Sequence, residues 1–110
     1  MLNLQEKTQA IVDALEEIKA NDISVIDTSK KSSLFDRMII ASANSNRQTR
    51  ALAQNVAKRL EEKGEKINST EGEKGGEWVL IDLGEVLVHV MQPAVRAYYS
   101  LEELWEKHPG

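Results

Sequence analysis

The two side chains of this chain best suited to chemistry are Asp82 and His89, in the last third of the sequence. A carboxylate beside an imidazole can transfer protons, and either group can bind a metal ion. Gly84 lies between two short apolar runs, a pattern typical of a tight β-hairpin. Such a hairpin makes Asp82 and His89 neighbours, because side chains alternate along each strand. The two could form a hydrogen-bonded structural pair, part of a binding surface, or a catalytic pair.

The rest of the sequence offers little to complete an active site. A catalytic metal needs about three protein ligands, and Asp82 and His89 supply two. The chain has no cysteine, and no serine lies in the Gly-x-Ser-x-Gly turn that exposes a hydrolase nucleophile. The second histidine, His108, stands in the C-terminal tail, where chains fray. We therefore expect no enzyme, no cofactor and no metal site.

Strand alternation divides the hairpin into two faces of different composition. The first is wholly apolar and is expected to meet the core; it consists of Val79, Ile81, Leu83, Val86, Val88 and Val90. The second is expected to face outward or toward a thinner layer; it consists of Trp78, Leu80, Asp82, Leu87, His89 and Met91. A tryptophan in a strand is more often part of a core. The second face is nevertheless large, amphipathic and free of lysine, as in the hot spots of protein interfaces.

Tyr98 and Tyr99 follow the hairpin in a short predicted helix that begins at Pro93. Consecutive helical residues point about 100° apart, so these two rings cannot both point into the core. At least one hydroxyl is expected to face solvent or a partner. The residues alone thus predict a small α/β domain with an adhesive sheet face.

Helical periodicity predicts the elements that flank this hairpin. Residues 3–20 carry apolar side chains at helical spacing, and Asn3 with Glu6 has the spacing of a capping box. Residues 46–63 form a second helix, with a capping box from Ser45 and Gln48 and with Gly64 at its end. A third capping box, Ser100 with Glu103, is predicted to start a last helical turn through Trp105 that Pro109 and Gly110 terminate.

Five short segments are predicted as strands: residues 23–27, 37–41, 66–70, 78–83 and 86–91. The second is a continuous apolar run, which indicates burial on both faces. Residues 66–70 read as a weak edge strand. The predicted order is α-β-β-α-β-β-β-α, an α/β fold of the α+β kind with helices packed on a five-stranded mixed sheet.

Size and composition bound the remaining possibilities. With 110 residues, of which 41% are apolar and 29% charged, the chain is expected to form one globular domain over residues 1–110. It has no apolar run of membrane-spanning length and no signal-peptide pattern, which indicates a cytoplasmic protein. The net charge of −4 argues against a protein that coats nucleic acid.

Basic side chains gather within residues 30–59, where Asp36 is the single acidic residue. They are Lys30, Lys31, Arg37, Arg47, Arg50, Lys58 and Arg59. They could be a solvated helix face with loop lysines. They could instead form a modest basic patch that steers association with an anionic partner.

The segment over residues 78–91, followed by residues 96–105, strongly resembles the ribosomal silencing factor family, also called Iojap-like. The resemblance extends upstream through most of the chain. It covers Asp22-Ile23 to Asp27, Lys31-Ser32-Ser33 with Asp36, Ile39-Ile40-Ala41-Ser42 and Ser45-Asn46-Arg47-Gln48.

This resemblance implies a fold related to nucleotidyltransferases but without their chemistry, and the chain has no Asp-x-Asp pair for a two-metal site. It also implies binding to the large ribosomal subunit through ribosomal protein fourteen. Occupying that face would block joining with the small subunit and lower translation when nutrients are scarce. Family members are commonly homodimers when free.

On this resemblance, we expect the partner contact on one sheet face and the adjoining helix. The expected contact residues are Trp78, Asp82, His89, Met91, Arg96, Tyr98 and Tyr99. Arg47 and Arg50 could lie near ribosomal RNA as a minor contact. Two alternatives stay open: a degenerate nucleotidyltransferase-like or hydrolytic enzyme using Asp82 and His89, and an assembly factor of the large subunit. The sequence also does not separate a dimer interface from the ribosome-binding face.

Overall fold

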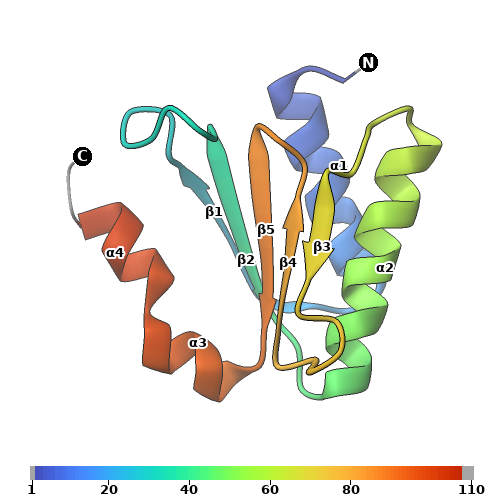
Figure 1. Ribbon diagram of the computed structural model, residues 1–110, viewed down its shortest axis with the longest axis vertical. Coiled ribbons are helices and arrows are strands. Elements are labelled where there is room, and N and C mark those ends of the chain that lie inside the picture. Colours follow the sequence, from blue (N-terminus) through green and yellow to red (C-terminus); the bar gives the residue numbers. More distant parts are fainter. Residues whose placement is uncertain (1, 108–110) are drawn as a thin grey trace.

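A five-stranded mixed sheet forms the centre of the computed structural model, which describes residues 2–107 (Figure 1). The strand order is β1-β2-β5-β4-β3. The strands are β1 (Asn21–Asp27), β2 (Arg37–Ser42), β3 (Ser69–Glu71), β4 (Trp78–Asp82) and β5 (Val86–Met91). The helices are α1 (Leu4–Glu17), α2 (Asn46–Glu62), α3 (Pro93–Tyr99) and α4 (Leu101–Lys107). The predicted α/β class and five-stranded mixed sheet are confirmed, and the last predicted turn is a separate helix.

The parallel pair of β2 and β5 lies at the middle of the sheet, and the other pairs are antiparallel. All of β2 after Arg37 is buried, so its predicted burial on both faces is confirmed. The edge strand after α2 covers Ser69–Glu71 instead of residues 66–70. Its register is set by pairing with β4, where Ser69 lies opposite Asp82.

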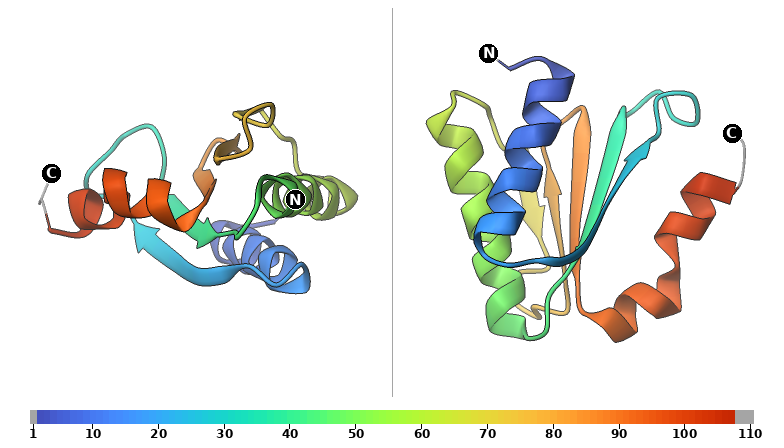
Figure 2. Two further views of the ribbon diagram at one scale, coloured as in Figure 1. Left: turned by 90° about the horizontal axis from the view of Figure 1, so that it is seen from below. Right: turned by 180° about the vertical axis from the view of Figure 1, so that it is seen from behind.

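The two long helices cover one face of the sheet (Figure 2). α1 starts in the predicted capping box: the Glu6 N–H donates to Asn3 Oδ1 at 2.8 Å, and the Asn3 N–H donates to Glu6 Oε1 at 3.0 Å. The helix ends at Glu17, earlier than predicted, because Lys19 adopts a left-handed conformation (φ 62°) and the Ala20 N–H reaches the Leu15 carbonyl.

α2 has only half of its predicted capping box. The Gln48 N–H donates to Ser45 Oγ at 3.0 Å, but the Gln48 side chain accepts from the Asn44 N–H. Gly64 closes the helix with a φ of 85°, as predicted. Leu52, Val56 and Leu60 of α2 pack into the main core, which also holds the valine-rich side of the hairpin.

The two short helices lie on the other side of the sheet and form a thinner layer (Figure 2). The predicted third capping box does not describe their junction. Ser100 ends α3 in a left-handed conformation, and its hydroxyl donates to the Ala97 carbonyl at 2.8 Å. Pro109 and Gly110, like His108, lie outside the described residues. Across the part of the chain that is described, no helix combines the length and the apolarity needed to cross a membrane.

Candidate protein interface

The β4–β5 hairpin positions most of the predicted contact residues. Its register places Trp78 opposite Met91, Leu80 opposite His89, and Asp82 opposite Leu87. Residues directly opposite in an antiparallel pair share a face of the sheet. The six apolar residues of the other face are all buried against α1 and α2, which confirms that assignment.

Met91 does not lie on an exposed face. It is fully buried in a second cluster with Ile26, Met38 and Ile40. Leu101 and Trp105 of α4 pack against the same cluster. Of the two orientations expected for this face, outward or toward a thinner layer, Met91 has the second, because α4 folds back across β1 and β2 and covers this part of the face.

His89 is also buried, with 6% of its surface exposed. Its Nδ1 accepts a hydrogen bond from the Trp78 indole N–H at 2.9 Å. Burial lowers the pKa of His89 to about 4, because a charged imidazole loses its hydration there. His89 is therefore neutral at physiological pH and lies beneath the surface, not on it.

Asp82 has a separate role at the tip of the hairpin. Its Oδ1 accepts from the Gly84 N–H at 2.8 Å, the hydrogen bond of an Asx turn. Gly84 itself has a φ of 86°, which favours glycine. Among the described residues, Asp82 and His89 form no hydrogen bond with each other, so the proposed structural or catalytic pair is not formed.

The tyrosines of α3 extend an aromatic row from the hairpin to the surface. Tyr99 packs on Trp78 with ring centroids 4.8 Å apart, and Tyr98 packs edge-on against Tyr99 at 5.1 Å. Tyr99 is 53% and Tyr98 83% exposed. The expectation that at least one tyrosine faces solvent is confirmed, and both do so.

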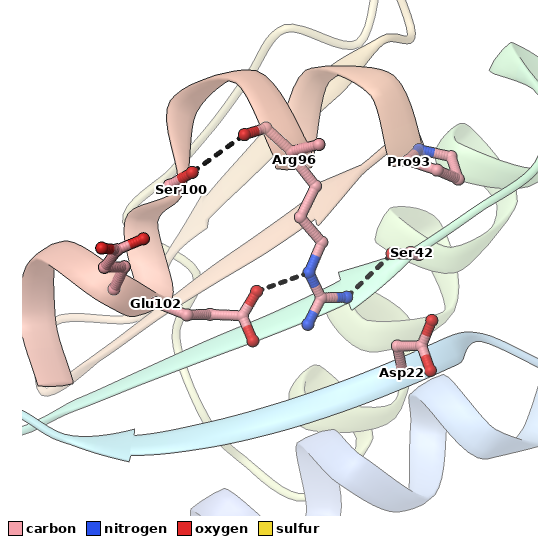
Figure 3. A pocket seen from close by; sticks show the side chains of 8 residues that line it. Asp22, Ser42, Pro93, Arg96, Ser100 and Glu102 are labelled. Carbon is pink, nitrogen blue, oxygen red and sulfur yellow. Dashed lines mark hydrogen bonds and ion pairs between the residues drawn. The ribbon is translucent and has the colours of Figure 1, made fainter.

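Arg96 projects from α3 toward the sheet, and not toward solvent (Figure 3). Its Nε donates to Glu102 at 2.7 Å, and its Nη1 donates to the Ser42 hydroxyl at 2.8 Å. Its side chain is 12% exposed. The hydrogen bond from Arg96 lowers the pKa of Glu102. Arg96 thus joins α3 to α4 and to the sheet, at the wall of an open hollow of about 400 Å³.

The accessible part of this surface includes two leucines that the sequence placed on the mixed face but not among the contact residues. Leu80 and Leu87 are half-buried, and in the β4–β5 register each neighbours His89 on this side of the sheet. Trp78, on which the aromatic row rests, lies on the same side of the hairpin, so these residues share one side of the molecule. We call it the aromatic face: Trp78, Leu80, Leu87, Tyr98 and Tyr99.

Two of the seven residues of the predicted basic patch, Arg37 and Arg59, have acidic partners. Arg59 pairs with Glu17 at 2.9 Å and with Glu62 at 3.1 Å, and Arg37 pairs with Asp27 at 3.0 Å. Arg50 donates to the Glu73 carbonyl at 3.3 Å. The acidic partners come from outside residues 30–59, which is why the local charge count overstated the patch.

The described residues hold no group of three or more His, Cys, Asp or Glu side chains that could hold a metal ion. The geometry offers an aromatic surface with the Asp82 carboxylate at its edge. Such a surface is suited to docking on another macromolecule.

Comparison with known proteins agrees with the resemblance in the sequence. Residues 2–110 match the family model described as ribosomal silencing factor during starvation. A relative named ribosomal silencing factor RsfS, from Chromobacterium violaceum, is 53% identical over 104 residues, which cover 94% of this chain and 85% of the relative.

A solved structure and a mouse protein extend the comparison. A crystal structure of a Chromobacterium violaceum protein superposes with a TM-score of 0.93 at 53% identity, and the match covers 94% of this chain and 87% of that one. A mouse protein named mitochondrial assembly of ribosomal large subunit protein 1 is 30% identical over 98 residues, which cover 86% of this chain but 43% of the mouse protein.

Proposed function

The chain belongs to the ribosomal silencing factor family, and from that premise we propose that it is a translational repressor. In this proposal it binds the large ribosomal subunit through ribosomal protein fourteen and sterically blocks joining with the small subunit. The effect lowers translation when nutrients are limiting. The action is steric, so it requires neither catalysis nor a cofactor.

The observation that carries this proposal is the exposure of the aromatic face. Two large rings, Tyr98 and Tyr99, stand on the surface; Tyr99 packs on Trp78, and Tyr98 packs on Tyr99. Soluble proteins rarely leave clustered aromatic rings in water unless a partner covers them. Tyrosine and tryptophan also contribute strongly to binding, because they bury a large area with few rotatable bonds.

The charge at the edge of this face supports a basic partner. Asp82 lies on the same side of the sheet as Leu80 and Leu87, and Glu71 of β3 lies opposite Leu80. Carboxylates at the rim of an interface mainly give specificity and a faster association rate. Such a contact allows a chain of net charge −4 to bind an RNA-rich particle through one of its proteins.

We assign different tasks to the contact residues predicted from the sequence. Trp78, Tyr98 and Tyr99 would touch the partner, with Asp82 at the rim. His89 and Met91 would support that surface from beneath, in keeping with their burial, and Arg96 would hold α3 against the sheet. Arg47 would be at most a minor contact with ribosomal RNA.

Sedimentation of ribosomal subunits tests this proposal. Purified large and small subunits are mixed at fixed magnesium and salt, with and without the protein. We expect fewer joined ribosomes and comigration of the protein with the large subunit. Normal joining at saturating protein would contradict the silencing proposal.

A matched pair of variants links the effect to the aromatic face. Tyr98→Ala is expected to weaken binding about tenfold or more, as for an interface aromatic. Leu34→Ala is the control, since Leu34 is also 83% exposed but lies in the loop between β1 and β2, at the opposite end of the sheet from α3 (Figure 1). Equal loss in both variants would remove the aromatic face from the proposal.

The name of the mouse relative favours a second candidate function, in assembly of the large subunit. Depleting the protein from cells separates the two. An assembly factor predicts immature large subunits during growth, whereas a silencer predicts mature subunits and excess joined ribosomes on starvation.

We also propose that the free protein is a cytoplasmic homodimer, as the family resemblance suggests. Light scattering coupled to size exclusion gives its mass directly. A monomer at all concentrations tested would contradict the dimer.

A further inference from the structure

The aromatic row begins at a buried histidine. Going outward, His89 is 6% exposed, Trp78 is half-buried, Tyr99 is 53% exposed and Tyr98 is 83% exposed. Each member contacts the next, through the indole N–H and then through ring packing. Among the described residues, one hydrogen bond joins members of this row, from Trp78 to His89.

The direction of that bond fixes the protonation of the imidazole. The indole nitrogen can only donate, so Nδ1 of His89 accepts and carries no proton. The proton of the neutral ring is therefore on Nε2. That atom is buried and has no hydrogen-bond partner among the described residues. The imidazole therefore makes one hydrogen bond, at Nδ1, while the buried N–H at Nε2 remains unsatisfied, which costs free energy.

The helix that presents the tyrosines depends on side-chain contacts of this kind. α3 has seven residues, and none of them is buried. Arg96 holds one side of the helix to Ser42 and Glu102. Tyr99, on the adjoining part of the helix, rests on Trp78. The orientation of the indole therefore sets the platform under Tyr99.

We propose that His89 is a positioning residue for the docking surface: its Nδ1 holds the Trp78 indole in the orientation that supports Tyr99 and Tyr98. The inference rests on the proposed function, because it assigns a role within the same surface. Holding the rings in place before docking lowers the ordering cost of binding, so it raises affinity without adding a contact.

Two substitutions of similar shape separate the acceptor from mere packing. His89→Asn places its side-chain oxygen near the position of Nδ1, while His89→Leu has a similar volume and no acceptor. The first readout is the Trp78 indole N–H in NMR spectra of the free protein, identified by its loss in Trp78→Phe. We expect His89→Leu to raise its exchange with water at least tenfold and His89→Asn to restore the protection.

The second readout is affinity for purified large ribosomal subunits. We expect His89→Leu to bind about tenfold more weakly, about 1.4 kcal/mol, and His89→Asn to recover most of this loss. In a Trp78→Phe background, where the donor is absent, the two substitutions should bind equally. This background also serves if His89→Leu alone fails to fold, because Trp78→Phe removes the same bond from the other side.

The two proposals fail in distinguishable ways. If the wild-type protein does not bind subunits, the proposed function fails, and the indole exchange still decides the positioning role. If the wild-type protein binds but His89→Leu and His89→Asn bind equally, His89 has no positioning role. An indole N–H that stays protected in His89→Leu would overturn the inference as well.

Discussion

At the scale of single residues, His89 makes stability depend on pH. Its pKa falls from 6.5 in the unfolded chain to about 4 in the folded protein, because burial disfavours the charged ring. Between these values the unfolded state binds more protons, so stability rises with pH. We expect the free energy of unfolding to drop by about 3 kcal/mol as pH falls from 7 to 4. Urea unfolding at a series of pH values measures it.

Two variants separate the contribution of His89 to this pH dependence from that of the carboxylates, which also lose their bonds in acid. His89→Asn should remove the slope between pH 6.5 and 4.5, where most carboxylates are still ionised. The control is His108→Asn at the chain's second histidine, which should keep the slope. If His89→Asn keeps the wild-type slope, the burial of His89 has no consequence for titration.

At the scale of elements, Arg96 determines how firmly α3 and α4 are held. Arg96→Lys keeps the charge but loses the planar group that reaches Glu102 and Ser42 together. We expect a loss of about 1–3 kcal/mol, typical of breaking buried hydrogen bonds to a charged group. Amide hydrogen exchange should show faster opening of α3 and α4 than of α1.

Arg59→Lys is the matched control for this change. Arg59 also bonds two carboxylates, but its side chain is 41% exposed. Pairs in water contribute little, so Arg59→Lys is expected to change stability far less than Arg96→Lys. Equal losses in the two variants would show that burial does not distinguish the two arginines.

Two glycines provide another test at this scale, because they share a backbone conformation but not an environment: Gly64 follows α2, and Gly72 lies in the loop between β3 and β4. Gly64 and Gly72 have φ values of 85° and 88°. A Cβ on Gly64 meets nothing within 4 Å, whereas one on Gly72 would lie 2.1 Å from the Trp78 carbonyl oxygen. Gly64→Ala should cost about 1 kcal/mol, and Gly72→Ala distinctly more. Thermal unfolding compares the two variants. Equal losses of stability would mean that the loop around Gly72 shifts to make room for the methyl group without further cost.

These elements also show which features the sequence could predict. The valine-rich face and the cap at Asn3 were predictable, because each depends on residues close together in the chain. The burial of Met91 was not, because it depends on α4 packing against β1 and β2. The same holds for Arg96, which bonds to Ser42, far away in the sequence. The bond of Asp82 to Gly84, in contrast, is local to the hairpin turn. Strand alternation gives the face of a residue, while coverage by distant elements decides whether that face is exposed.

At the scale of the whole molecule, a buried ion pair joins segments that are far apart in sequence. Lys7 of α1 lies 3.0 Å from Glu65, which follows α2, and 3.8 Å from Glu85 in the turn between β4 and β5. Glu65 also accepts from the Leu2 N–H at 3.1 Å, and these bonds lower its pKa. The Glu85 carbonyl in turn accepts from the N–H groups of Asp36 and Arg37. The pair therefore ties both long helices to the same end of the sheet.

Removing the cation alone should be costly, since it leaves a buried carboxylate without its charge partner. We expect Lys7→Met to lower the free energy of unfolding by about 3 kcal/mol. Adding Glu65→Gln should recover much of that loss, because the amide oxygen still accepts from Leu2 without a charge to compensate. Lys58→Met on the exposed side of α2 is the control and should change stability by less than about 0.5 kcal/mol. Urea unfolding of the four proteins decides the matter: if the double variant is no more stable than Lys7→Met, the loss arises from packing of the lysine stem and not from the unpaired charge.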